Sequence, residues 1–165
     1  MIITVKGKPI KELSMMRMLD ATRDDVWKAW VTPAMFARWW APKMVSIPEC
    51  RLDVRKGGAI HVVMHGPKGT DFDMDMQVLG EYKEVISPKR LVFVNSPLDG
   101  KGKPLFDVLE TVELEERNGK TKLSINAKVL NVFIQKEQAA PFLMGMDQGF
   151  AESMENLADV LKGEK

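Results

Sequence analysis

VWKAWVTPAMFARWWAP, residues 26–42, contains all four tryptophans of the chain and predicts two consecutive short helices. Thr22 and Asp25 form a variant capping box ahead of the first helix, and apolar residues then recur at helical spacing. Thr32 followed by Pro33 predicts the start of the second helix, because threonine caps helices and proline suits the first helical position. We expect these two helices, called the tryptophan helices below, to bury aromatic side chains and to close one end of the fold.

Alternating apolar and polar residues predict strands around the tryptophan helices. A first strand is predicted over residues 13–19, with residues 1–5 as a short extension. The other predicted strands span residues 60–64, 71–78, 91–94, 108–115 and 121–129. Asn118-Gly119, between the last two strands, is typical of a tight hairpin turn. The sequence therefore predicts six or seven antiparallel strands.

The last apolar pattern is helical. Apolar residues recur every three or four positions from near Pro141 to Leu161, and Gly163 predicts the end of this helix. A curved antiparallel sheet with one apolar face can wrap around a long amphipathic helix. This arrangement buries the apolar surfaces of both the sheet and the helix. We therefore predict an α+β fold and one domain over residues 1–165.

The predicted strands 60–64 and 71–78 form a hairpin, whose register decides how the two histidines are interpreted. Matching the buried faces places Met64, Val62 and Ile60 opposite Phe72, Met74 and Met76, respectively. The same register places His65 opposite Asp71 and His61 opposite Asp75. Cross-strand pairs on a solvated face need neither a metal nor a catalytic role, so we interpret both histidines as structural.

Several motifs, taken in their order along the chain, resemble those of a known superfamily. They are Arg17, Trp-Trp-x-Pro at 39–42, Asp-x-Arg-x-Gly-Gly at 53–58, Pro-x-Gly at 67–69, and the run GEYKEVISPKRLVF at 80–93. From about residue 13 to residue 161, the chain resembles the SRPBCC (START-like, helix-grip) superfamily, in the branch related to the activator of the heat shock protein 90 ATPase. The resemblance implies a helix-grip fold of the Bet v-like type, with two short helices after the first strand and a cavity between sheet and C-terminal helix.

Methionines are frequent on the faces that would line such a cavity. The predicted lining is Trp39, Met64, Met74, Met76, Phe93, Glu110, Ile125, Met146 and Phe150. Methionine is flexible and polarizable, so it suits a surface that accommodates apolar ligands. Plain core packing is the alternative interpretation.

Glu110 is in phase with Val108, Val112 and Leu114 and is therefore predicted to face inward. A buried carboxylate must find a partner, take up a proton or reach water. We hypothesise that Glu110 is a polar group in a largely apolar ligand pocket. The alternative is that local twist or a bulge carries its side chain to solvent.

Composition and missing motifs restrict the classes of function. The net charge of +1, with both signs mixed along the chain, predicts no affinity for nucleic acid. The sequence shows no apolar run long enough for a membrane span and no secretion signal, so we expect a cytoplasmic protein. Cys50 is the only cysteine, which excludes a disulfide within the chain. No nucleophile elbow, phosphate loop or zinc-protease motif is present, so no catalytic residue, metal or cofactor is predicted.

Three hypotheses of function follow. The first, implied by the resemblance, is a monomer or homodimer that binds a small hydrophobic or aromatic molecule in the cavity. The second is a chaperone-binding, co-chaperone-like module with a role in the stress response. The third is a cyclase-like or hydrolase-like enzyme that uses Glu110 as an acid or base.

Overall fold

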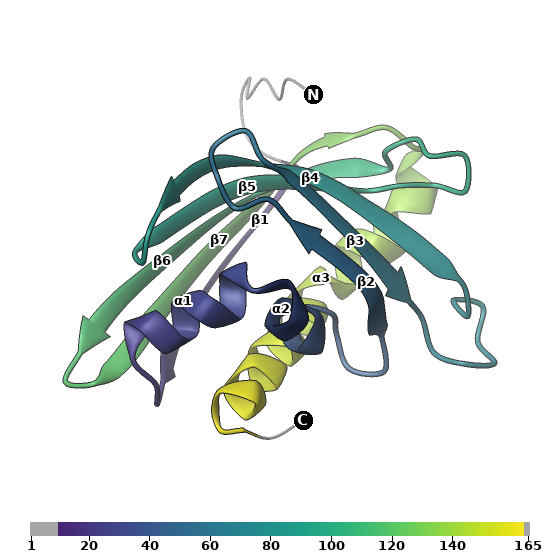
Figure 1. Ribbon diagram of the computed structural model, residues 1–165. Helices are drawn as coiled ribbons and strands as arrows, with labels where there is room; N and C mark the ends of the chain where they lie inside the picture. Colours follow the sequence, from purple (N-terminus) through teal and green to yellow (C-terminus); the bar gives the residue numbers. More distant parts are fainter. Residues whose placement is uncertain (1–9, 164–165) are drawn as a thin grey trace.

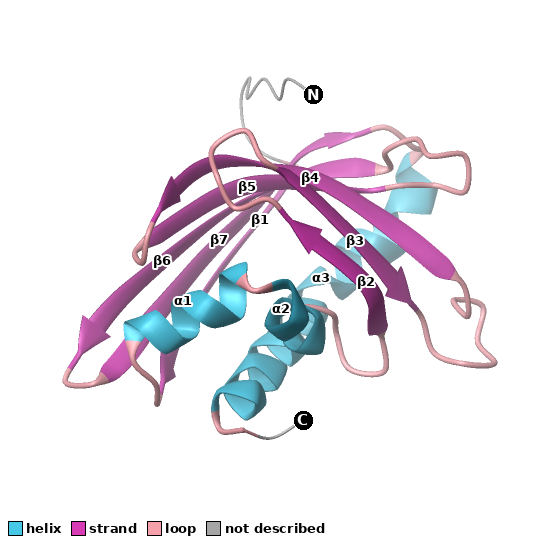
Figure 2. Cartoon of the chain, viewed as in Figure 1, coloured by secondary structure: helices cyan, strands magenta, loops and turns pink. Residues whose placement is uncertain are grey.

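A curved, seven-stranded antiparallel sheet wraps around one long helix (Figure 1, Figure 2). The computed structural model describes residues 10–163 of the chain. The strands are β1 (Lys11–Leu19), β2 (Ser46–Leu52), β3 (Ala59–His65), β4 (Asp75–Ile86), β5 (Arg90–Pro97), β6 (Phe106–Arg117) and β7 (Lys120–Val132). The helices are α1 (Arg23–Val31), α2 (Pro33–Trp39) and α3 (Lys136–Leu161). The strand order is β1-β7-β6-β5-β4-β3-β2, so the predicted α+β fold class is confirmed.

Local signals account for the tryptophan helices α1 and α2. The Thr22 side chain accepts a hydrogen bond of 3.2 Å from the backbone N–H of Asp25, as the capping box predicted. Pro33 occupies the first turn of α2, although the Thr32 side chain makes no capping bond. Figure 1 shows both helices beneath the concave side of the sheet, beside the C-terminal half of α3.

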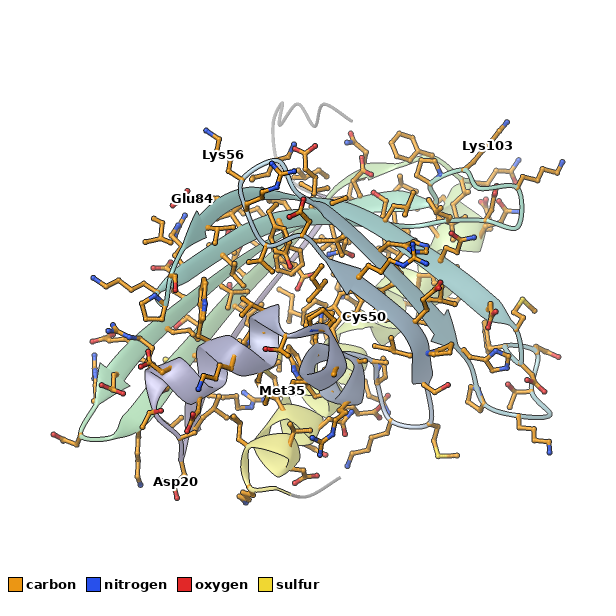
Figure 3. The ribbon with its side chains drawn as sticks, in the orientation of Figure 1. Asp20, Met35, Cys50, Lys56, Glu84 and Lys103 are labelled. Atoms are coloured by element: carbon orange, nitrogen blue, oxygen red, sulfur yellow. The ribbon has the colours of Figure 1, made fainter. Side chains whose placement is uncertain are left out.

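Two clusters of buried apolar side chains lie between the sheet and the helices. Figure 3 shows many side chains gathered in this space. The first cluster joins the tryptophan helices to the C-terminal half of α3 and includes Trp30, Trp39 and Leu157. The second joins the N-terminal half of α3 to β6 and β7 and includes Phe106 and Val129. The two clusters therefore meet along α3.

Strand β2 was not predicted as a separate strand. Its sequence, SIPECRL, does not alternate strictly, and its pairing with β3 shifts register between Ser46 and Glu49. A bulge of this kind adds a residue to one strand and interrupts the period of two on which the prediction depended. The hairpin between β6 and β7 is confirmed, with positive φ angles of 53° at Asn118 and 78° at Gly119.

The predicted register between β3 and β4 is wrong. Met64 lies opposite Met76 rather than Phe72, and His65 lies opposite Asp75 rather than Asp71. The ladder is thus displaced by four residues, because β4 begins only at Asp75 and the connection before it is longer than a tight turn. An even displacement keeps the same side chains on the same face, so the predicted faces survive while every predicted partner changes. The same displacement brings Val62 and Ile60 opposite Val78 and Gly80 instead of Met74 and Met76.

Both histidines pair with side chains of the β3–β4 hairpin, but with partners other than those predicted. His65 places Nδ1 2.7 Å from Oδ1 of Asp75 and Nε2 2.7 Å from Oδ1 of Asp73. His61 lies opposite Leu79, and its Nε2 is 3.1 Å from Oε1 of Gln77. The other Asp73 oxygen accepts a bond of 2.9 Å from the Gly69 backbone N–H, so His65 and Asp73 together hold the β3–β4 connection against the sheet.

We expect the His65 imidazole to titrate above its ordinary pKa in an NMR titration. Its hydrogen bonds to Asp75 first, and then to Asp73, favour the charged form and raise the pKa of His65. A raised folded-state pKa gives stability that is complete below about pH 6.5 and is lost as pH rises through the folded value. Asp75→Asn should lower the pKa of His65, whereas Asp71→Asn should leave it unchanged. Equal titration curves in both variants would contradict this assignment.

Helix α3 begins at Lys136, five residues before the predicted start, so Pro141 lies inside the helix. The prediction treated this proline as a first-turn residue, but one proline near the beginning of a helix removes a single backbone hydrogen bond, and the packed faces of α3 offset that loss. Gly163 has a φ of 82°, the left-handed conformation expected just after a helix. The predicted strand extension at residues 1–5 lies outside the described residues.

Candidate functional site

A cavity of about 340 Å³ lies between the concave face of the sheet and α3, where the two core clusters meet. Its sheet wall consists of Met64, Met76, Val78, Asn95, Phe106, Val108, Glu110 and Ile125, with Pro97 at the end of β5. The tryptophan helices contribute Trp30, Trp39 and Trp40, with Pro42 just beyond them. Helix α3 contributes Pro141, Phe142, Gly145, Met146, Gly149, Phe150, Ser153 and Met154. Apolar side chains thus make up most of the wall.

Most of the predicted lining residues meet at this cavity. Seven of the nine border it, namely Trp39, Met64, Met76, Glu110, Ile125, Met146 and Phe150. Met74 does not, because it precedes β4 and its side chain is 58% exposed. Phe93 does not either, because it packs in the core between Trp30 and Tyr82, with ring centroids 6.4 and 6.1 Å away. That the seven bind a ligand stays a prediction.

The sequence analysis missed several lining residues that carry polar groups, among them Asn95, Ser153 and Trp30. The strand around Phe93 was predicted to end at residue 94, so Asn95 was not considered. If the alternation had been continued by two residues beyond Phe93, Asn95 would have been placed on the inward face. Trp30 was predicted to be buried but not to line the cavity, because its place depends on how α1 packs against the sheet.

Hydrogen bonds hold the tryptophan helices against the rest of the cavity wall. Trp39 Nε1 donates to the backbone oxygen of Ala29 at 2.8 Å, which ties α2 to α1. Ser153 Oγ, on α3, donates to the backbone oxygen of Trp40 at 2.7 Å. These bonds tie α2 to α1 and the end of α2 to α3.

Glu110 is the one ionisable side chain among the lining residues, and it is 2% exposed. Asn95 Nδ2 donates a hydrogen bond to its Oε2. Its Oε1 has no hydrogen-bond partner among the described residues. Burial raises the pKa of Glu110 to about 7, although the bond from Asn95 acts in the opposite direction. The predicted inward orientation of Glu110 is therefore confirmed.

The indole N–H of Trp30 is a second unpartnered polar group in the cavity wall. Trp30 is 2% exposed, and within the described part of the chain its Nε1 finds no acceptor. Buried polar groups in folded proteins are paired in the great majority of cases, so an unpaired donor and an unpaired acceptor in one cavity need an explanation.

The buried carboxylate of Asp107 shows that this fold can satisfy such a group. Asp107 is fully buried on the same strand as Glu110 but does not line the cavity. It accepts hydrogen bonds from Ser96 Oγ and, at 3.0 Å, from Asn131 Nδ2. The unpaired oxygen of Glu110 is thus particular to the cavity and not a general property of the sheet.

The described residues give no evidence of a reactive cysteine or of a metal site. Cys50 is half-buried on β2, where burial raises the pKa of its thiol to about 11, so the unreactive thiol form prevails at neutral pH. Residues 10–163 contain no group of three or more histidine, cysteine or acidic side chains arranged to hold a metal ion. Among the helices described, none is both long and apolar enough to cross a membrane.

Residues 20–162 match the family described as "Activator of Hsp90 ATPase homolog 1-like protein". The chain belongs to this family. The resemblance seen in the sequence motifs is confirmed, and family and fold together support a START-like ligand-binding domain. No curated protein matches the chain in sequence.

Solved structures share the fold of this family member. A crystal structure of a Nitrosomonas europaea protein is 26% identical, with a TM-score of 0.73 and coverage of 92% of this chain and 94% of that one. A solution structure of an Arthrobacter aurescens protein is 25% identical, with a TM-score of 0.78 and coverage of 99% and 93%. A Silicibacter pomeroyi protein named for the same family is 19% identical, with a TM-score of 0.73 and coverage of 94% and 100%, and shows the fold alone.

Gly145→Ala should raise the free energy of unfolding by up to about 1 kcal/mol, because glycine costs that much relative to alanine inside a helix. An added Cβ at Gly145 would meet no atom within 4 Å. At Gly149, also on α3, it would lie 3.4 Å from Cγ of Pro42, so Gly149→Ala should gain less. Urea denaturation of both variants measures the difference. A larger gain at Gly149 would contradict the packing described here.

Proposed function

We propose that this protein binds a small, largely apolar molecule in the cavity between the sheet and α3. The observation that carries the proposal is the unpaired Oε1 of buried Glu110 in a wall that is otherwise mostly apolar. Ligand sites in proteins combine these features, namely a concave apolar surface and a few polar groups that orient the ligand. The cavity volume of about 340 Å³ is near the lower end of the usual range of about 300–1,000 Å³.

The methionines support the same proposal. Met64, Met76, Met146 and Met154 come from the two sides of the cavity, the first two from the sheet and the others from α3. Thioether side chains rotate easily and can adapt to ligands of different shape. A wall of this composition favours recognition of apolar shape over a single rigid fit.

Native mass spectrometry of freshly purified protein tests the proposal directly. We expect a population heavier than the chain by the mass of one small molecule, and loss of that mass after denaturation. A thermal-shift series with small apolar compounds should identify stabilising ligands, since a ligand that binds only the folded state raises its stability. If no mass is retained and no compound stabilises the protein, the proposal is wrong.

Met146→Trp should weaken the binding of any such compound by at least about tenfold, because the larger side chain takes up cavity volume. The matched control is Met144→Trp, two residues earlier on α3, where the native side chain is 80% exposed and does not line the cavity. Calorimetric titration of both variants with a compound from the thermal-shift series measures the effect. Equal losses in the two variants would place the binding site elsewhere.

A further inference from the structure

We propose that the ligand is an uncharged molecule with a hydroxyl group on an apolar ring system, and that Trp30 and Glu110 recognise this hydroxyl. The inference rests on the proposed function and adds the chemical class of the ligand. It follows from two unpaired buried atoms, Trp30 Nε1 and Glu110 Oε1, on residues that line the cavity.

The two atoms require complementary partners. An indole N–H only donates a hydrogen bond, so Trp30 needs an acceptor. An ionised carboxylate oxygen only accepts, whereas a protonated carboxyl group can also donate, so Glu110 in either state can pair with a group that both donates and accepts. A hydroxyl group does both.

Trp30 and Glu110 both line the cavity and have Phe93 as a common neighbour. The Trp30 ring centroid lies 6.4 Å from that of Phe93, and Phe93 is the direct cross-strand neighbour of Glu110 in the β5–β6 ladder. Asn95, two residues along β5 on the same face, occupies the Oε2 side of Glu110. Oε1 is therefore the oxygen that remains for a ligand.

Other ligand classes leave one of these groups unsatisfied or repelled. A carboxylate ligand only accepts hydrogen bonds, so it could pair with Glu110 only in the protonated state and would meet a second negative charge once Glu110 ionises in the water-poor cavity. An ammonium ligand only donates, so it would pair with Glu110 but leave the Trp30 N–H without an acceptor. A pure hydrocarbon satisfies neither group.

The rest of the wall fits a ring system. Four aromatic side chains border the cavity in addition to Trp30 and Trp39, namely Trp40, Phe106, Phe142 and Phe150. Aromatic walls favour aromatic ligands through edge-to-face and offset contacts. A cavity of about 340 Å³ suits a compound of one or two rings better than a long acyl chain.

The experiment compares four probes with the same bicyclic frame: naphthalene, 2-naphthol, 2-naphthoate and 2-naphthylmethylammonium. Affinities are measured by calorimetry at neutral pH with ligand-stripped protein. We expect 2-naphthol to bind at least about tenfold more tightly than naphthalene, because two formerly unpaired groups gain partners. Naphthoate and the ammonium compound should bind more weakly than 2-naphthol.

Trp30→Phe removes the N–H donor and keeps an aromatic ring at this position. It should reduce the preference for 2-naphthol over naphthalene to a few-fold. The control is Trp40→Phe, a cavity residue whose indole nitrogen is not among the unpartnered atoms and whose loss should not alter the preference. In the unaltered protein, the NMR signal of the Trp30 indole proton should move downfield on addition of 2-naphthol but not of naphthalene.

The outcomes separate this inference from the proposed function. If naphthalene and 2-naphthol bind equally well, the cavity binds apolar molecules but the hydroxyl inference is wrong. If the charged probes bind most tightly, the inference is also overturned. If none of the four binds and native mass spectrometry finds no retained molecule, both fail.

Discussion

Glu110→Gln should raise the free energy of unfolding of the ligand-free protein above pH 8 by roughly 3 kcal/mol, with almost no change below pH 4. The reason is the burial of an ionisable group beside a single hydrogen-bond donor, Asn95. Burial raises the pKa of Glu110 from 4.5 to about 7. A glutamine has the same shape and carries no charge at any pH, so it does not incur the cost of a buried charge.

The direction of the pH dependence follows from proton binding. Between about pH 4.5 and 7 the folded protein keeps a proton on Glu110 that the unfolded chain has released, so the contribution of this group to stability falls as pH rises. Below this window both states are protonated, and above it both are ionised, so no further change comes from Glu110. The difference between the protein and its Glu110→Gln variant therefore develops within that window.

Urea denaturation at a series of pH values measures this difference. The matched control is Glu115→Gln, on the same strand, where the native side chain is 56% exposed and pairs with Arg117. Exposed pairs of this kind contribute little, so this variant should follow the unaltered protein at every pH. If Glu110→Gln also follows it, the Glu110 carboxylate reaches water in solution.

The inward position of Glu110 could be predicted because β6 is regular on both sides of this residue. From Val108 to Leu114 every second residue is buried, and no bulge interrupts the alternation. A period of two then assigns each side chain to a face without any knowledge of the neighbouring strands. The same reasoning assigned Ile125 on β7 correctly to the inner face.

The same reasoning could not predict the β3–β4 connection or the strand partners that depend on it. Residues 71–78 alternate without a break, but only those from Asp75 onward belong to the strand, and Phe72 is exposed. The connection before Asp75 is held by hydrogen bonds from Thr70 Oγ1 to the Pro67 carbonyl and from the Gly69 N–H to Asp73. Alternation assigns faces but does not identify partners, so an even displacement could not be detected from the pattern.

The polar chemistry of the cavity depends on elements that are distant in sequence. Trp30, Asn95 and Glu110 come from α1, β5 and β6, and what matters is which of their polar atoms lack a partner. Sequence patterns give the face of each element but not the distance between side chains on different elements. The unpaired atoms, which carry both proposals, were therefore visible only in the structure.

Gly58→Ala should lower the free energy of unfolding by about 3 kcal/mol, a change at the upper end of single substitutions. A Cβ at this position would lie 1.8 Å from the backbone oxygen of Asp53, which no side-chain rotation can relieve. Gly58 closes the turn between β2 and β3, where its N–H donates to the Arg55 carbonyl at 2.8 Å and its carbonyl accepts from the Tyr82 N–H at 3.0 Å. Moving the Gly58 backbone would disturb both bonds and the buried Tyr82 ring.

Gly100→Ala is the matched control for Gly58→Ala. A Cβ at Gly100, in the connection between β5 and β6, would meet no atom within 4 Å, so this variant should change stability by less than about 0.5 kcal/mol. Urea denaturation of both variants separates the steric effect from a general intolerance of alanine in turns. Because the turn holds β3 against β4 at Tyr82, the Gly58 variant should also lose amide-exchange protection in those two strands first. Equal stability of the two variants would mean that the backbone of residues 53–58 can open without affecting the sheet.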